Sequence, residues 1–227
     1  ERLVTIEDAA ELNLNHAHVV RMETRSANME GVGQVTQRDL LRNALRMRPD
    51  RIILGECRGA ETVDMLQAMN TGHEGSLTTV HANDTRDSLS RLELMIGLAN
   101  VEIPVSIMRT YIASAFNIIV HVSRLAGGSR RIVKVSEMIG LGKKQNYRLR
   151  DIFTFEQTGV EKGHAIGTFR ATGYQPRLLS RFARAGFPID EQLFESRVLA
   201  EVQSPSSTAF AEEPPIVLEQ APEGDRR

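Results

Sequence analysis

The stretch RIILGE, residues 51–56, joins four residues typical of a buried β-strand to a glycine and a carboxylate. Two further stretches follow the same plan: Leu3–Ile6 leads into Glu7, and Ser76–Val80 leads into His81. In open α/β sheets the carboxyl ends of parallel strands form one edge, and ligands bind there. We therefore expect two carboxylates and an imidazole to meet at one sheet edge, where they could orient water, hold a magnesium ion and sense a phosphate.

Each of these side chains also has a simpler explanation. Loops that follow strands often carry Asp or Glu as helix caps, and a lone histidine at a strand end is more often structural than catalytic. The hypothesis of a site therefore depends on the three residues occurring together.

Helical patterns and short apolar runs alternate over residues 2–122, which predicts a three-layer α/β domain. Thr36 and Asp39 have the spacing of a capping box, so a helix should begin after Thr36 and stop before Pro49. Further predicted strands are His18–Met22 and Asn117–Val122, the latter buried. The other predicted helices end at Gly72, follow Asn83 or Asp84, and run from Pro104 to about Ser114.

The pattern changes after residue 122. Gly127 and Gly128 separate Ile118–Val122 from Arg131–Val135, which predicts a β-hairpin, and Tyr147–Phe155 could extend the same sheet.

The rest of the chain is predicted to be less regular. Residues 160–202 are interpreted as a glycine-punctuated loop with one helix, Pro176–Ala185. From Gln203 onward Pro, Ser, Glu and Ala dominate, and we expect a disordered tail over residues 203–227.

Charge and composition exclude several classes of protein. The formal net charge of −1 gives no global electrostatic reason for nucleic-acid binding. The single cysteine, Cys57, rules out an internal disulfide framework and fits a reducing compartment. No stretch approaches the ~20 apolar residues that a membrane-spanning helix needs.

A metal hydrolase is disfavoured by the spacing of the histidines. His73 and His81 flank a predicted strand, and eight extended residues span up to ~26 Å, whereas the ligands of one zinc ion each lie ~2 Å from it. His16 and His18 are interpreted as a surface pair, and the sequence contains no H-E-x-x-H motif and no pair of cysteines.

A phosphate-binding loop of the form G-x-x-x-x-G-K-[S/T] is absent from the sequence. Residues 1–133 contain no lysine, and Gly142-Lys143 is followed by Lys144 rather than by Ser or Thr. The backbone amides and lysine that such a loop supplies to phosphates are therefore missing from this chain.

Three motifs resemble those of the type II/type IV secretion-system ATPases. VTIEDAAEL (residues 4–12) resembles their Asp box, LRMRPDRIILGE (45–56) resembles their atypical Walker B, and QAMNTGHEGSLTTVHAN (67–83) resembles their His box. The motifs occur in family order and at family-like spacing, and the resemblance covers about residues 3–139. Within the superfamily the sequence looks most similar to the Flp, or tight-adherence, pilus assembly ATPases of the CpaF type.

The resemblance implies a RecA-like P-loop NTPase motor domain that hydrolyses ATP with Mg²⁺, and it implies roles for four residues. Glu7 would be the general base that polarises the attacking water, and Glu56 would act through magnesium by way of a bound water. His81 would approach the γ-phosphate, while His73 would be the second His-box member, farther away.

The resemblance also implies an assembly: a homo-hexameric ring that works in the bacterial cytoplasm, peripheral to the inner membrane, on secretion or pilus platform proteins. Arg21 and Arg25 would be candidates for charge stabilisation across the ring interface. A solvated or salt-bridged sheet edge explains these two arginines equally well. No direct nucleic-acid binding is expected.

In this family the Walker A strand, loop and helix lie just upstream of the Asp box. We therefore expect a fragment: residues 1–139 as the C-terminal part of the ATPase domain, 140–202 as a C-terminal extension and 203–227 as the tail. The fragment alone should bind ATP weakly and hydrolyse it negligibly. The alternative is a non-catalytic assembly or regulatory module that pairs with the intact secretion ATPase.

Overall fold

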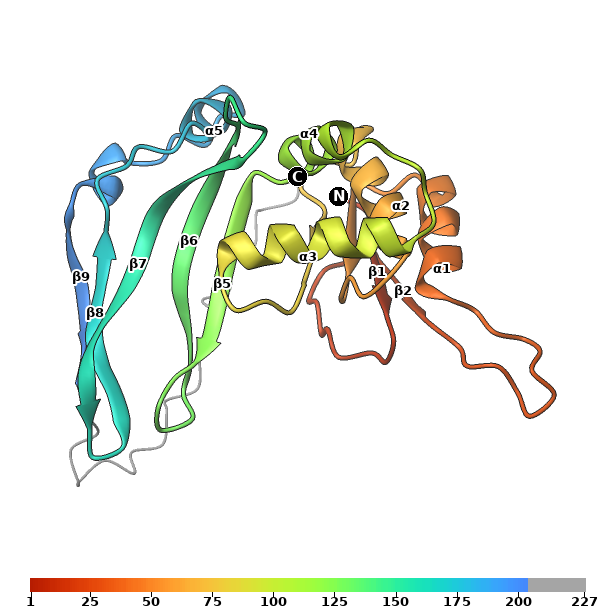
Figure 1. Ribbon diagram of the computed structural model, residues 1–227, viewed down its shortest axis with the longest axis horizontal. Helices are drawn as coiled ribbons and strands as arrows, with labels where there is room; N and C mark the ends of the chain where they lie inside the picture. Colours follow the sequence, from red (N-terminus) through yellow and green to blue (C-terminus); the bar gives the residue numbers. More distant parts are fainter. Residues whose placement is uncertain (204–227) are drawn as a thin grey trace, which may run out of the picture.

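The computed structural model describes residues 1–203, which build two separate β-sheets (Figure 1). The first is a parallel sheet of four strands in the order β2-β1-β3-β4. Its strands are β1 (Leu3–Glu7), β2 (Val19–Glu23), β3 (Arg51–Leu54) and β4 (Leu77–Thr78). Four of the five strands predicted for the α/β domain therefore lie in this sheet, although β4 is much shorter than the predicted Ser76–Val80. The fifth, Asn117–Val122, falls in the second sheet.

Helices cover the parallel sheet and follow its strands β2, β3 and β4 along the chain (Figure 1). Side chains of β1 and β3 such as Val4, Ile6 and Ile52 have no solvent exposure. A parallel sheet covered on both faces needs such apolar strands, which is why these runs were recognisable in the sequence. The helices are α1 (Gln37–Ala44), α2 (Glu61–Asn70), α3 (Thr85–Leu98) and α4 (Val105–Ala115).

The helix boundaries follow the predicted signals. The hydroxyl of Thr36 accepts from the backbone N–H of Asp39, and the Asp39 carboxylate accepts from the backbone N–H of Thr36, which confirms the capping box. A short 3₁₀ turn, η1 (Leu45–Met47), follows α1 before Pro49. Asp84 is the N-cap of α3 and Pro104 precedes α4.

The second sheet is antiparallel, with the order β5-β6-β7-β8-β9. The predicted hairpin is confirmed, because β5 and β6 pair across a turn in which Gly127 and Gly128 both have positive φ. Expecting a buried strand at Asn117–Val122 was wrong: Val120 and Val122 of β5 are 51% and 54% exposed. The strands are β5 (Ile118–Arg124), β6 (Arg130–Leu141), β7 (Tyr147–Glu161), β8 (His164–Ala171) and β9 (Arg197–Val202).

The interpretation of residues 160–202 as mainly loop was also wrong, because the segment contributes β8 and β9. Strand β8 was missed since its inward residues are small. At Gly167 an added Cβ would lie 2.3 Å from the Glu156 carbonyl oxygen of β7, so only glycine fits there. The predicted helix is confirmed in shorter form as α5 (Leu179–Arg184), and a 3₁₀ turn, η2 (Glu191–Phe194), follows it.

The remaining regional predictions are not decided by the fold. The boundary at residue 139 stays a prediction, and β6 continues across it to Leu141. The predicted disordered tail lies outside the described residues, apart from Gln203. Among residues 1–203, no helix combines the length and apolar character that crossing a membrane requires.

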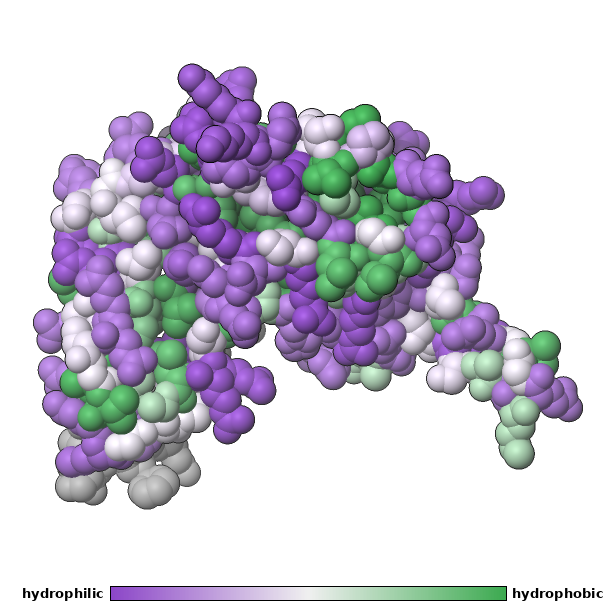
Figure 2. Space-filling view, viewed as in Figure 1, coloured by the Kyte–Doolittle hydropathy of each residue, from purple (hydrophilic) through white to green (hydrophobic). Residues whose placement is uncertain are grey.

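Apolar side chains are exposed around the end of α3 and along α4 (Figure 2). Leu98 is 71% exposed, and Leu94, Val105, Ile107 and Tyr111 are each at least half exposed. This patch lies on the helical layer of the first sheet.

Candidate functional site

Strands β1, β3 and β4 are parallel neighbours, as expected, and their carboxyl ends form one edge. Ile6 is paired with Leu54, and Leu54 with Thr78, so the residues that follow these strands leave the sheet together. A cavity of 110 Å³ lies at this edge. Its lining comes from the loops after β1 and β3 and from α1: Glu7, Asp8, Ala9, Glu11, Gln37, Gly55, Glu56 and Arg58.

Glu7 is held in a fixed orientation although it lines the cavity. Glu7 is only 5% exposed. Its Oε1 accepts hydrogen bonds from the backbone N–H groups of Glu11 and Leu12, both at 3.0 Å. Gly55 of the neighbouring loop packs against it: a Cβ there would lie 3.4 Å from the Glu7 Cγ, in van der Waals contact. The loop after β1 thus folds back to orient one carboxylate, which is the arrangement that a positioned base requires.

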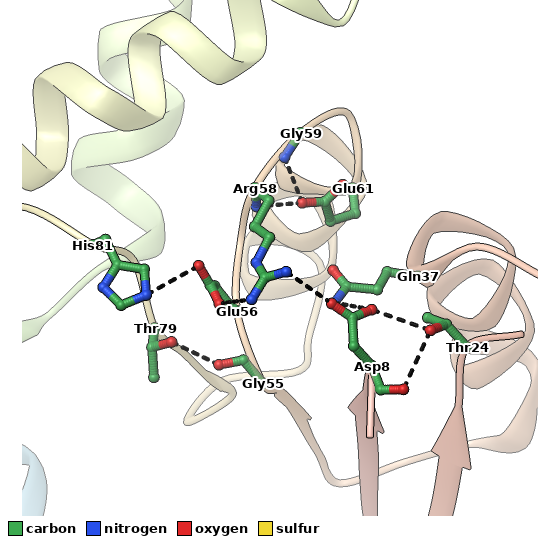
Figure 3. A network of polar contacts seen from close by, with 10 residues as sticks. All are labelled: Asp8, Thr24, Gln37, Gly55, Glu56, Arg58, Gly59, Glu61, Thr79 and His81. Atoms are coloured by element: carbon green, nitrogen blue, oxygen red, sulfur yellow. Dashed lines mark hydrogen bonds and ion pairs between the residues drawn. The ribbon is translucent and has the colours of Figure 1, made fainter. Parts of the chain in front are cut away.

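Glu56 and His81 meet at the same edge, which the sequence predicted. The Nε2 atom of His81 lies 3.4 Å from Glu56 Oε1 (Figure 3). The hydroxyl of Thr79 donates to the carbonyl oxygen of Gly55 at 2.6 Å and so fastens the loop after β4 to the loop after β3. The His81 side chain is 81% exposed, so its imidazole faces solvent beside the carboxylate.

Arg58 is a member of the site that sequence reasoning missed. Its guanidinium Nη2 lies 2.7 Å from Glu56 Oε2, and its Nη1 lies 3.3 Å from Asp8 Oδ2 (Figure 3). The hydrogen bond from Arg58 holds the pKa of the Glu56 carboxyl below its usual value, so Glu56 is anionic at neutral pH. The available signal was an arginine placed two residues after a strand-end carboxylate.

Asp8, the residue after Glu7, joins several elements. Its Oδ1 accepts from the Thr24 hydroxyl and from the Gln37 side-chain amide, both at 3.1 Å. Asp8 therefore ties the end of β1 to the segment after β2 and to α1, while its other oxygen faces Arg58.

His81 lies beside this cavity, next to Glu56, without lining it, and His73, Arg21 and Arg25 do not line it either. His73 lies before β4, at the opposite end of that strand from His81, and its buried Nδ1 atom has no hydrogen-bond partner within residues 1–203. Arg21 donates to the carbonyl oxygen of Leu14 at 3.1 Å, and Arg25 donates to that of Gly33 at 2.7 Å. Both arginines are exposed, and Arg25 lines a neighbouring cavity of 270 Å³ that it shares with Asp8 and Arg58.

The side chains at this edge suit a Mg²⁺ ion that binds together with a phosphate ligand. They do not suit a Mg²⁺ ion bound by protein groups alone. Within the described part of the chain, no group of three His, Cys, Asp or Glu side chains could hold a metal ion. Magnesium is usually held by one or two carboxylates together with substrate phosphates and waters. Glu56, an anionic carboxylate at the mouth of the cavity, matches that single-carboxylate pattern.

Comparison with known proteins gives related sequences and structures. A putative conjugal transfer protein of Mycobacterium tuberculosis is 47% identical over 136 residues, 60% of this chain and 38% of the relative. The type IV secretion system protein PtlH of Bordetella pertussis is 43% identical over 143 residues, 59% of this chain and 40% of the relative. The chain thus spans about two fifths of the length of these curated relatives.

A solved structure and a family description agree with those relatives. The crystal structure of the VirB11 ATPase from the Brucella suis type IV secretion system, in complex with sulphate, superposes with a TM-score of 0.53 at 35% identity, over 60% of this chain and 41% of that one. The family described as "Type II/IV secretion system protein" matches residues 1–173. The chain therefore belongs to the type II/IV secretion system protein family.

Proposed function

We propose that this chain is part of the ATP-hydrolysing motor of a bacterial secretion or pilus-assembly system. The observation that carries the proposal is the meeting of Glu7, Glu56 and His81 at the carboxyl edge of one parallel sheet. Such an edge is where open α/β sheets bind ligands. The VirB11 relative, which is named an ATPase, adds support from outside the chain.

In this proposal each residue at the edge has one task. Glu7, held by two backbone N–H groups, orients the attacking water and accepts its proton. Glu56 would hold Mg²⁺ by way of a bound water, and His81 would contact the γ-phosphate side from its exposed position. Mg²⁺, when bound, would neutralise the negative charge of the phosphates. His73, at the far end of β4, positions the loop before that strand rather than touching nucleotide.

A phosphate loop has to come from outside this sequence, and the fold leaves space for it. Strands β4 and β5 are the end strands of their sheets, and cavities of 310 and 610 Å³ lie between them. Apolar residues on these strands, including Leu77 and Val120, are more than half exposed. We propose that a strand of the longer RecA-like domain enters between β4 and β5 and brings the P-loop to the Glu56 edge.

The wider assembly is part of the same proposal. The longer protein forms a homo-hexamer in the cytoplasm, docks on inner-membrane platform proteins and belongs to the Flp pilus branch. The exposed apolar patch on α3 and α4 supports protein contacts. Arg21 and Arg25, whose side chains donate to nearby carbonyl groups, would face the next subunit's nucleotide.

The proposal is tested by phosphate release from the longer protein that carries the P-loop. Glu7→Gln should lower turnover by at least about 100-fold, because a general base typically contributes that much, while ATP binding is retained. Glu23→Gln is the matched control, since Glu23 is the register partner of Glu7 on β2. Unchanged turnover in Glu7→Gln would refute the assignment.

A non-catalytic assembly module remains a second candidate, favoured by the absence of any lysine in residues 1–133. That role predicts that the 227-residue chain binds an intact secretion ATPase and alters its turnover. Failure of the purified chain to bind such an ATPase, measured by ultracentrifugation, would remove this candidate.

A further inference from the structure

Glu61 is a buried carboxylate that the proposed chemistry does not use. It is the first residue of α2 and is 9% exposed. Its Oε1 accepts hydrogen bonds from the backbone N–H groups of Arg58 and Gly59, at 2.5 and 2.6 Å (Figure 3). The helix thus reaches back, through one side chain, to the loop that carries Glu56.

The loop between β3 and α2 is fastened at three points. The backbone N–H of Gly55 donates to a carbonyl oxygen of β1, and that of Cys57 donates to a carbonyl oxygen in the loop after β4. These two points join backbone to backbone, whereas the third depends on the side chain of Glu61. A substitution at Glu61 can therefore remove the third point and leave the other two in place.

The bonds of Glu61 do not belong to an ordinary helix cap. A cap accepts from N–H groups inside the first turn of its helix, whereas Arg58 and Gly59 precede Ala60, the N-cap residue of α2, which has no side-chain cap bond. Gly59 allows a close approach, since an added Cβ would lie 3.3 Å from Glu61 Oε2. The carboxylate therefore orders the loop before the helix rather than the helix itself.

The end of the loop that Glu61 holds is the end from which Arg58 reaches Glu56. Arg58 Nη2 lies 2.7 Å from Glu56 Oε2, and the other oxygen of Glu56 lies 3.4 Å from His81 Nε2. Holding the backbone of Arg58 fixes the origin of its side chain and so the orientation of the carboxylate that it pairs with. Groups that orient a metal-site residue typically contribute about tenfold to 100-fold to affinity or activity.

We propose that Glu61 is a positioning residue that holds the Arg58 end of the loop and thereby keeps one oxygen of Glu56 directed to the His81 side of the edge. The inference deepens the proposed function of this edge and rests on it. Glu61 touches neither nucleotide nor metal in this role; it acts through the backbone of Arg58.

The first measurement uses the 227-residue chain without nucleotide and follows hydrogen exchange of single backbone amides by nuclear magnetic resonance. Glu61→Ala should speed exchange at Arg58 and Gly59 by at least about tenfold, because each amide loses a hydrogen bond to a charged acceptor. Gly55 and Cys57, which donate to backbone carbonyl groups, should change much less. Glu61→Gln keeps a carbonyl oxygen at the same place and should restore most of the protection.

The second measurement is phosphate release by the longer protein over a range of Mg²⁺ concentrations. Glu61→Ala should lower kcat by about tenfold to 100-fold and raise the Mg²⁺ concentration needed for half-maximal turnover, while Glu61→Gln should stay close to the parent. In a Glu56→Gln background, Glu61→Ala should cause little further loss, because Glu61 acts through Glu56.

Glu137→Gln is the matched control. Glu137 is also a buried carboxylate that accepts from two successive backbone N–H groups, those of Arg177 and Leu178, but it lies on β6. Its substitution should lower the stability of the protein and leave the turnover of the folded protein unchanged.

The inference is overturned if Glu61→Ala leaves exchange of the two loop amides as in the parent chain, or if it leaves turnover unchanged. It is overturned equally if the loss of turnover is as large in the Glu56→Gln background, or if Glu137→Gln lowers turnover as much, because the loss then reflects folding alone.

These outcomes leave the proposed function standing as long as turnover of the longer protein depends on Glu7. A longer protein without Glu7-dependent turnover would instead overturn the proposed function, and the inference with it.

Discussion

The two sheets of this protein use their buried positions differently. In the parallel sheet no residue of the inner strands β1 and β3 is exposed, and the carboxylates of the candidate site, Glu7 and Glu56, stand where these strands end. In the antiparallel sheet the end strand β5 leaves every second residue exposed. The predicted site residues Glu7, Glu56 and His81 therefore lie at one edge of the first sheet, whereas the second sheet carries none of them.

Each sheet nevertheless contains one buried carboxylate, and the hydrogen bonds of these two carboxylates distinguish a site role from a structural role. Glu7 is 5% exposed and Glu137 on β6 is 2% exposed. Glu7 accepts both of its hydrogen bonds through a single oxygen. Glu137 uses both oxygens, accepting from the hydroxyl of Tyr174 and from the backbone N–H groups of Arg177 and Leu178. One carboxylate keeps an oxygen for chemistry, and the other fastens the segment that leads into α5.

The largest difference should come from apolar truncation. Ile52→Ala in β3, where the side chain is fully buried, should lower the free energy of unfolding by about 3 kcal/mol. Ile132→Ala in β6, where the residue is 50% exposed, should change it by less than about 0.5 kcal/mol. Urea unfolding followed by circular dichroism measures both, and equal losses would break the contrast between the two sheets.

The buried carboxylates should respond unequally to amide substitution. Hydrogen-bond donors face both oxygens of Glu137, so Glu137→Gln places its NH₂ group against a donor. The free energy of unfolding should fall by about 2 kcal/mol. Glu7→Gln can keep both backbone hydrogen bonds through its remaining carbonyl oxygen and should cost less than about 1 kcal/mol. Thermal and urea unfolding of the two variants decide the matter; a larger loss at Glu7 would make that residue structural.

The smallest effect should come from an ion pair between the two regions. Lys134 of β6 lies 3.0 Å from Asp84, the N-cap of α3, and the pair is partly exposed. Lys134→Gln should lower stability by about 0.5 kcal/mol at neutral pH, while Lys143→Gln in the turn after β6 should lower it less.

The pH dependence of that pair has a defined sign. Burial acts to raise the pKa of Asp84, but the bonds from Lys134 and from the Thr85 backbone outweigh it and hold the pKa below the ordinary 3.8. The contribution to stability is therefore complete above pH 3.8 and is lost as the pH falls through the lowered pKa. Urea unfolding over this range should show the parent chain and Lys134→Gln converging, and a difference that persists in acid would contradict the assignment.

How much could be predicted from the sequence differs between the two sheets. Strands β1 and β3 of the first sheet were predictable because their apolar runs, which have no exposed residue, end beside polar residues such as Glu7. In the second sheet β8 was not predicted, because small residues such as Gly167 pack closely against β7 and give no alternation of apolar and polar residues. The site shows the same limit. Strand ends predicted that Glu56 and His81 meet. For Arg58 the sequence shows only its position two residues after Glu56, and the direction of its side chain depends on the folded loops.

The central claim is that this chain holds the water-activating edge of a motor whose phosphate loop lies elsewhere. Its most direct test is ATP turnover by the isolated 227-residue chain beside the longer protein that carries the P-loop, each with and without Glu7→Gln. The account predicts background phosphate release from the 227-residue chain, unchanged by Glu7→Gln, and turnover by the longer protein that depends on Glu7. Turnover well above background by the 227-residue chain alone, abolished by Glu7→Gln, would contradict it.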